Sequence, residues 1–149
     1  MIIFEENILF HMYNSLSNIT QNGQNSQYFL DFICQLEGWK TKCKNLHWSA
    51  PNEMIHARLD EFLDIISDFQ DSLAEEMMGI FGKLNPNDVQ GVSTNFNTAM
   101  EFISAVKMNT LKYYRGIPQT PDFAGLKSEC ESFIHEINKY TYLFSLCFY

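Results

Sequence analysis

The sequence predicts an all-α protein, a four-helix bundle in which a long crossover joins the second and third helices. Apolar residues recur at spacings of three and four over several long stretches, a period typical of helices that bury one face. Between the second and third of these stretches lies a segment rich in turn-forming residues and longer than most helix connections. A four-helix bundle needs such a connection when its second and third helices run parallel.

The composition is that of one folded, acidic domain. The chain has 149 residues, which is a single domain by length, and 46% of them are hydrophobic, which excludes a disordered chain. The formal net charge of −8 argues against a general nucleic-acid coat and would instead attract cations. The sequence therefore favours a globular protein that attracts cations, and it leaves open whether DNA is bound through a folded surface.

The cysteines and the N-terminus indicate the compartment. The four cysteines form no CxxC pair, so we expect free thiols in a reducing environment rather than a zinc site. Met1–Phe4 is apolar, but Glu5 and Glu6 follow at once, and no basic leader precedes them. No apolar run is long enough to span a bilayer. We expect a soluble, cytoplasmic protein with no membrane association.

Residues 1–26 are predicted to form an N-terminal arm or a short helix. Its apolar positions are Ile3, Ile8, Phe10 and Leu16. Thr20–Ser26 is polar around Gly23, so we expect a linker that ends at Ser26, a residue type that caps helices. The bundle domain then spans residues 27–149.

The first two bundle helices are predicted over residues 27–48 and 52–81. Pro51 ends the connection between them, and Asn52 starts the second helix. In the first helix the predicted core positions are Phe29, Ile33, Leu36, Trp39 or Lys40, Cys43 and Leu46. In the second they are Ile55, Leu59, Phe62, Ile66, Phe69, Leu73, Met77 and Ile80.

The second half of the chain holds the crossover and two more helices. Residues 83–94 have turn chemistry, and Pro86–Gln90 could supply one turn of a short extra helix. The third helix is predicted over residues 95–114 and the fourth from Thr120-Pro121 to near the C-terminus. The predicted core positions are Phe96, Met100, Ile103, Val106, Leu111 and Tyr114, then Phe123, Leu126, Cys130, Phe133, Ile137, Tyr140 and Phe144.

A second stripe of the second helix carries metal-ligand side chains. Its members are His56, Asp60, Asp64, Ser67, Asp71 and Glu75, and the only basic residue between His56 and Gly82 is Arg58. His56 and Asp60 lie roughly 22 Å along the helix axis from Asp71 and Glu75, whereas ligands of one ion lie within about 2–2.5 Å of it. One copy of the helix therefore cannot complete a site.

An antiparallel pair of these helices removes that difficulty. A two-fold axis near Ile65 and Ile66 brings the His56 end of one copy opposite the Glu75 end of the other. Because a two-fold interface is self-complementary, the dimer has two equivalent sites. His47, at the end of the preceding helix, adds a nitrogen ligand from the chain that supplies His56.

The motif resembles a known family. It consists of His47-Trp48, then His56-x-x-x-Asp60, then Asp71-x-x-x-Glu75. This pattern resembles the ferroxidase signature of the Dps family, or miniferritins, whose bundle is ferritin-like and whose metal site is shared between two subunits. The match covers roughly residues 27–82 well and the later helices loosely, and the connection between His47 and His56 is shorter than is usual in the family.

The resemblance implies an activity and an assembly. We expect a ferroxidase that oxidises Fe(II) with hydrogen peroxide or oxygen for iron storage and oxidative protection, with His47, His56, Asp60, Asp71 and Glu75 as metal ligands and a hollow dodecamer as the assembly. Some members bind DNA through a tail rich in lysine and arginine. No lysine or arginine precedes Lys40 here, so we do not expect DNA binding by that route.

Other interpretations of the same residues stay open. The acidic stripe could be a solvated helix face, and His47 could be a capping or core histidine. Trp48 is expected to pack rather than to take part in chemistry, and Asp64 to support the ligands or face solvent. The bundle could also be a Dps-like structural or assembly protein without catalysis, or could hold zinc in place of iron, since tetrahedral nitrogen and oxygen ligation suits zinc as well.

Overall fold

The computed structural model describes residues 2–147, with side chains from residue 25 onward. Its helices are α1 (Ile2–Trp48), α2 (Glu53–Phe81), α3 (Ala99–Arg115) and α4 (Ala124–Leu146), with short 3-10 turns η1 (Pro86–Asp88) and η2 (Pro121–Phe123). No strand occurs in this part of the chain. The predicted all-α class with four helices is confirmed. Over residues 2–147 none of the helices combines the length and apolar character needed to cross a membrane.

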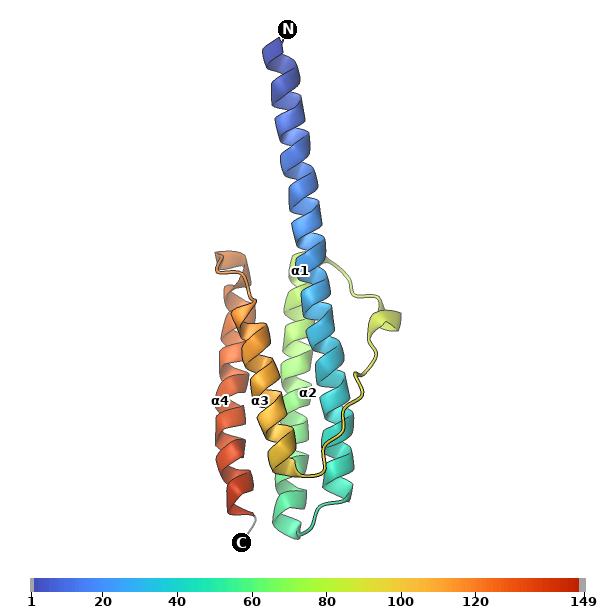
Figure 1. The fold of residues 1–149 in the computed structure, drawn as a ribbon, viewed down its shortest axis with the longest axis vertical. Helices are drawn as coiled ribbons and strands as arrows, with labels where there is room; N and C mark the ends of the chain where they lie inside the picture. The colour runs from blue at the N-terminus through green and yellow to red at the C-terminus, as the bar shows by residue number, and fades with distance from the viewer. Residues whose placement is uncertain (1, 148–149) are drawn as a thin grey trace.

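The helices form a bundle from which one end of α1 projects (Figure 1). α1 and α2 make an antiparallel hairpin, α2 also packs on α4, and α3 packs mainly on α4. The crossover, residues 82–98, returns along α1, so α2 and α3 run in the same direction (Figure 1). The turn η1 lies within this crossover, where the sequence predicted a helical turn. The N-terminal part of α1 extends well beyond the other helices.

The core follows the predicted apolar stripes closely. All predicted positions of α1, with Trp39 rather than Lys40 pointing inward, are buried, and so are those of α4. Phe32 was not predicted; it is buried and stacks on Tyr113 of α3, with ring centroids 4.1 Å apart. The aromatic core continues through Phe62, Phe69 and Phe133, with 4.2 Å between the last two rings. Burial of large aromatic side chains is the main source of stability in such a bundle.

The predicted linker at Thr20–Ser26 is wrong. α1 is helical without interruption from Ile2 to Trp48, so Ser26 caps no helix. Gly23 in a helix costs only about 1 kcal/mol relative to alanine, and no proline interrupts the segment. Extending an existing helix is easier than starting a new one, because nucleation is the costly step. The side chains of Ile3, Ile8, Phe10 and Leu16 lie outside those described.

Smaller differences concern the helix ends. α3 begins at Ala99 rather than residue 95, because the Thr98 hydroxyl accepts a hydrogen bond from the Glu101 amide, 3.1 Å away, and caps the helix there. Phe96 therefore precedes the helix, although its ring still lies against Phe102. Ile80 was predicted in the core but is exposed. The first turn of α4, at Gly125, lies beside Glu76 of α2. Ile80 is one helical turn further along α2, so it lies beyond the end of α4.

Three predicted core positions of α3 are only partly buried: Met100, Leu111 and Tyr114. In their place Thr110 is fully buried. The helix packs mainly on α4, and a single neighbour covers a narrower stripe than periodicity alone suggests.

The crossover is held against α1 by close backbone contact at Gly38. The Val92 amide donates to the Cys34 carbonyl at 3.1 Å. A Cβ at Gly38 would overlap the Val92 carbonyl oxygen, and a Cβ at Gly91 would lie 3.2 Å from the Gly38 nitrogen. Gly38 thus lets the crossover lie directly on the α1 backbone, which positions the loop beside the outer face of α1 and α2.

We expect Gly38→Ala to destabilise the protein by about 1–3 kcal/mol, because the added methyl group forces the crossover off α1. Gly79→Ala is the matched control: Gly79 also lies within a helix, and a Cβ there meets nothing within 4 Å. It should be neutral or stabilising by up to about 1 kcal/mol. Urea unfolding followed by circular dichroism measures both, and equal effects would contradict the role assigned to Gly38.

Candidate metal centre

The turn between α1 and α2 is tied down from both sides. Asn52 caps α2, with its side-chain oxygen accepting from the Ile55 amide at 3.0 Å. Its side-chain nitrogen donates to the Cys147 carbonyl at 3.1 Å, which links the turn to the end of α4. The groups at this end of the hairpin are therefore held in fixed positions relative to α2 and the end of α4.

His47 and His56 form a reciprocal pair across this turn. His47 Nδ1 lies 2.8 Å from the His56 carbonyl oxygen, and His56 Nδ1 lies 2.9 Å from the His47 carbonyl oxygen. The two rings stack with their centroids 3.7 Å apart. His47 is only 8% exposed, whereas His56 lies on the surface. Each imidazole is thus oriented by the backbone of the other residue.

These hydrogen bonds determine which nitrogen of each ring is free. A carbonyl oxygen can only accept, so the Nδ1 atom of both histidines must carry the hydrogen. In the neutral rings, Nε2 then has the lone pair that a metal ion binds. A backbone carbonyl on the other ring nitrogen is the usual means by which proteins orient a metal-binding histidine. The arrangement is chemically suited to metal binding, although it also makes a stable structural clasp.

Asp60 lies beside His47 at this end, and we call the three residues His47, His56 and Asp60 the histidine half. His47 Nε2 lies 3.9 Å from Asp60 Oδ1, less than the sum of two metal–ligand bonds of about 2.1 Å each. Lys44 Nζ lies 3.7 Å from the same carboxylate oxygen. The lysine competes with any cation for Asp60, but both groups are more than a third exposed, so the ion pair is weak.

Asp71 and Glu75 lie apart from the histidine half. We call these two residues the carboxylate half. Both are exposed on α2, and at about 1.5 Å per residue Asp71 is roughly 16 Å along the helix from Asp60. Among the described side chains, no group of three or more histidine, cysteine, aspartate or glutamate residues could hold a metal ion. The five predicted ligands therefore fall into two separate groups within one chain.

A hollow of about 460 Å³ lies beside the carboxylate half, between α1, α2 and the crossover. It is lined by Ile33, Glu37, Lys40, Ser67, Asp68, Gln70, Asp71, Ala74, Leu84 and Val89. Its walls carry three carboxylates and one ammonium group, and its apolar part comes from both helices and the crossover. The sequence did not predict it, because the hollow depends on where the crossover lies.

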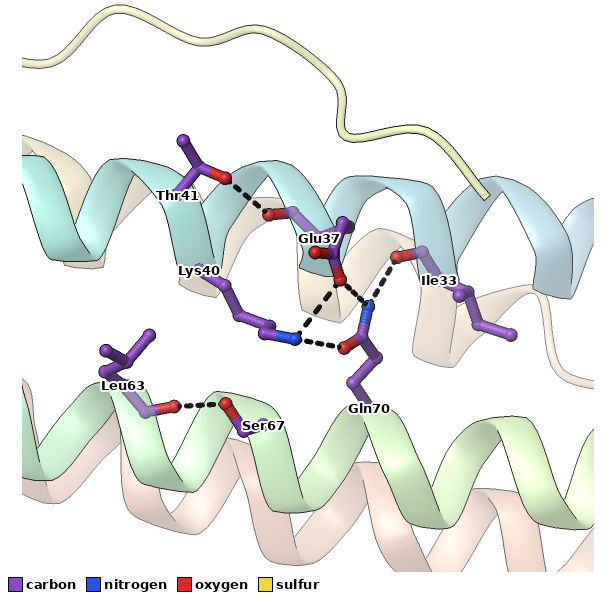
Figure 2. Close-up of polar contacts among 7 residues, drawn as sticks. All are labelled: Ile33, Glu37, Lys40, Thr41, Leu63, Ser67 and Gln70. Carbon is purple, nitrogen blue, oxygen red and sulfur yellow. Dashed lines mark hydrogen bonds and ion pairs between the residues drawn. The ribbon is translucent and has the colours of Figure 1, made fainter. Parts of the chain in front are cut away.

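A polar network in the hollow connects α1 to α2, as Figure 2 shows. Gln70 Nε2 donates to Glu37 Oε2 at 2.8 Å and to the Ile33 carbonyl at 3.2 Å, and Lys40 Nζ donates to Gln70 Oε1 at 3.0 Å. The hydrogen bond from Gln70, with a smaller effect of Lys40, lowers the pKa of Glu37 against the opposing effect of burial. The network fixes the register of the two helices near their midpoint.

Other groups that could bind a metal ion lie apart from both halves. Glu131 and His135 are exposed on α4, where Glu131 accepts a hydrogen bond from Tyr114 at 2.6 Å. The four cysteines are free, as predicted. Burial raises the pKa of Cys43 to about 12, and that of Cys130 to about 12, so both stay protonated thiols that do not bind metal readily.

Trp48 differs from expectation. It is 71% exposed rather than packed, because it ends α1 just before the connection to α2 and none of the described residues covers that face.

The chain was compared with protein-family models, curated proteins and solved structures. None of the three comparisons finds a match.

We expect Gln70→Ala to bring the pKa of Glu37 back toward its ordinary value, because the main hydrogen bond to the carboxylate is lost. The pKa of Glu37 is lowered in the folded state, so its stabilisation is present above the unfolded pKa and is lost as pH falls through the folded pKa. The variant should lose about 1 kcal/mol at neutral pH and less in acid. NMR titration of the carboxyl groups measures the pKa of Glu37, and urea unfolding at neutral and at acid pH measures the free energy of unfolding. The control is Gln90→Ala, at an exposed position.

Proposed function

We propose that the chain pairs through the outer face of α1 and α2 into a two-fold dimer and oxidises Fe(II) at two intersubunit sites. In each site the histidine half of one copy meets the carboxylate half of the other. The observation that carries this proposal is the orientation of His47 and His56: backbone carbonyls hold both Nδ1 atoms, which leaves the Nε2 atoms for a metal ion, and His47 Nε2 lies 3.9 Å from Asp60 Oδ1. The parallel course of α2 and α3 supports a ferritin-like bundle of the Dps type, with a dodecamer as the expected assembly.

The charge of α2 favours cation entry. The helix carries eight carboxylates against one arginine: Glu53, Asp60, Glu61, Asp64, Asp68, Asp71, Glu75 and Glu76. Such a surface raises the local concentration of ferrous ions. The carboxylates favour Fe(III) over Fe(II), because hard oxygen ligands suit the more highly charged ion. The free cysteines fit a reducing compartment such as the cytoplasm.

The redox step balances with peroxide as the oxidant. Two ferrous ions each give one electron to one hydrogen peroxide molecule, its O–O bond breaks, and two protons complete two water molecules. The protein binds and positions the iron, and the ferric product then hydrolyses to mineral on an acidic surface.

A second candidate is a structural or assembly protein of the same fold. The reciprocal histidine pair would then serve only as a clasp for the turn, and Asp60 would pair with Lys44 instead of a metal ion. The same donors could also hold zinc without redox chemistry. Anaerobic titration of Fe(II) and Zn(II) by calorimetry separates these: one ion per chain, bound at micromolar affinity and followed by oxidation in air, is expected only for the ferroxidase.

We expect Asp71→Ala with Glu75→Ala to abolish iron oxidation without loss of the fold, since both side chains are exposed and mutually repelling without metal. The control is Asp122→Ala with Glu131→Ala, which removes the same charge from exposed positions on the α3–α4 side of the bundle. Oxidation is followed by absorbance of the ferric product, and the fold by thermal unfolding. A full rate in the double variant would eliminate the assignment.

Mixing two inactive variants tests whether the site is shared. One variant is His56→Ala and the other is Asp71→Ala with Glu75→Ala. In the homodimer of either variant, both sites have lost ligands. In a mixed dimer one site carries all the changes and the other none. With random exchange half the dimers are mixed, so about a quarter of the wild-type sites should return. If the mixture binds no more metal than either variant alone, the site is not shared.

A further inference from the structure

Trp48 lies on the same face of α1 as the residues that line the hollow. Lys40, Lys44 and Trp48 follow one another at intervals of four, which places them in one row along the helix. Lys40 is a wall of the hollow, and Lys44 contacts Asp60. A large apolar side chain that is 71% exposed in a row of charged residues is covered by nothing in the described chain.

The pairing of α1 with α2 gives the level of Trp48 along the bundle. Lys44 lies beside Asp60, and Trp48 follows Lys44 by one turn, so Trp48 stands at the level of the first turns of α2, near His56. A two-fold axis between Ile65 and Ile66 exchanges the level of residue 56 with that of residue 75, and of residue 60 with that of residue 71. Trp48 of one copy then stands level with residues 71–75 of the other.

The hollow lies at that level. Its α2 wall runs from Ser67 to Ala74, and side chains on α1 lean toward the helix N-terminus, which moves the indole further toward the centre of the hollow. The fold alone does not require this agreement, because Trp48 lies at the turn end of the hairpin and the hollow begins near its middle.

Charge favours the same pairing. The end of the face near Trp48 carries Lys44, Asp60 and the two histidines, whereas the end near the hollow carries Lys40 with the three carboxylates Asp68, Asp71 and Glu75. Antiparallel pairing brings Lys44 of one copy to the level of Asp71 of the other. Parallel pairing would set carboxylates against carboxylates, which costs free energy.

We infer that Trp48 of one copy inserts into the hollow of a second copy and anchors the dimer. The inference rests on the proposed function, because the two-fold axis is the one that completes the metal sites. The indole buries its apolar body against Ile33, Ala74 and Leu84, and its N–H donates to a carboxylate on the rim. Tryptophan is the residue type most often found as such an anchor.

Fluorescence tests this directly, because the chain has two tryptophans in opposite environments. Trp39 is 0% exposed and Trp48 71% exposed, so acrylamide quenching reports Trp48. Quenching is measured over a range of protein concentrations, without metal and with Zn(II), alongside sedimentation equilibrium. We expect quenching to fall as the dimer forms. Trp48→Ala should weaken dimerisation at least about tenfold, while Met108→Ala, which removes an equally exposed side chain from α3, should not.

The outcomes separate the inference from the proposed function. If the protein dimerises and binds metal while Trp48 stays fully quenchable, the anchor is wrong and the shared metal site stands. If Trp48→Ala and Met108→Ala dimerise equally well, the anchor is also wrong. If the protein stays monomeric with and without metal at every concentration, both the anchor and the shared site are overturned.

Discussion

The rise of the α-helix is the constraint on which the candidate site depends. Each residue advances the chain by about 1.5 Å, so no choice of rotamer brings Asp60 and Asp71 together on α2. Within the described chain, no group of three or more histidine, cysteine, aspartate or glutamate side chains could hold a metal ion. The candidate ligands of α2 share one face of the helix. A two-fold axis between Ile65 and Ile66 would bring each half opposite the other half of a second copy.

The histidine half owes its geometry to the turn rather than to any ligand. Asn52 links the turn to both α2 and the end of α4, and each imidazole is fixed by a carbonyl of the other histidine's residue. Donors held before the ion arrives lose little entropy when it binds. The carboxylate half lacks comparable supports, since Asp71 and Glu75 are exposed on a bare helix face. One half is thus pre-organised and the other adaptable.

Helical periodicity could predict the core, because a helix that is buried on one side has an apolar residue every three or four positions. It also suggested the candidate ligands on α2, which share that period and stay a prediction. It could not find the hollow, whose third wall is the crossover, nor the Glu37–Gln70 bond, because both depend on how separate segments lie in space. It also failed at Thr20–Ser26, where polar residues typical of turns continue a helix. Local propensity is weak wherever a helix is already under way.

In the proposed dimer, repulsion between carboxylates couples dimerisation to metal binding. Two copies of α2 bring many carboxylates face to face, and Lys44 is the nearest positive charge to the proposed ligands. Without cations this repulsion opposes pairing, whereas Trp48 in the hollow favours it. A divalent ion at each site removes this repulsion and adds bonds to both chains, so it stabilises the dimer. Linkage is reciprocal: the free energy by which the ion stabilises the dimer equals the free energy by which dimerisation strengthens metal binding. Metal affinity should therefore depend on protein concentration, a property that a site contained within one chain would not have.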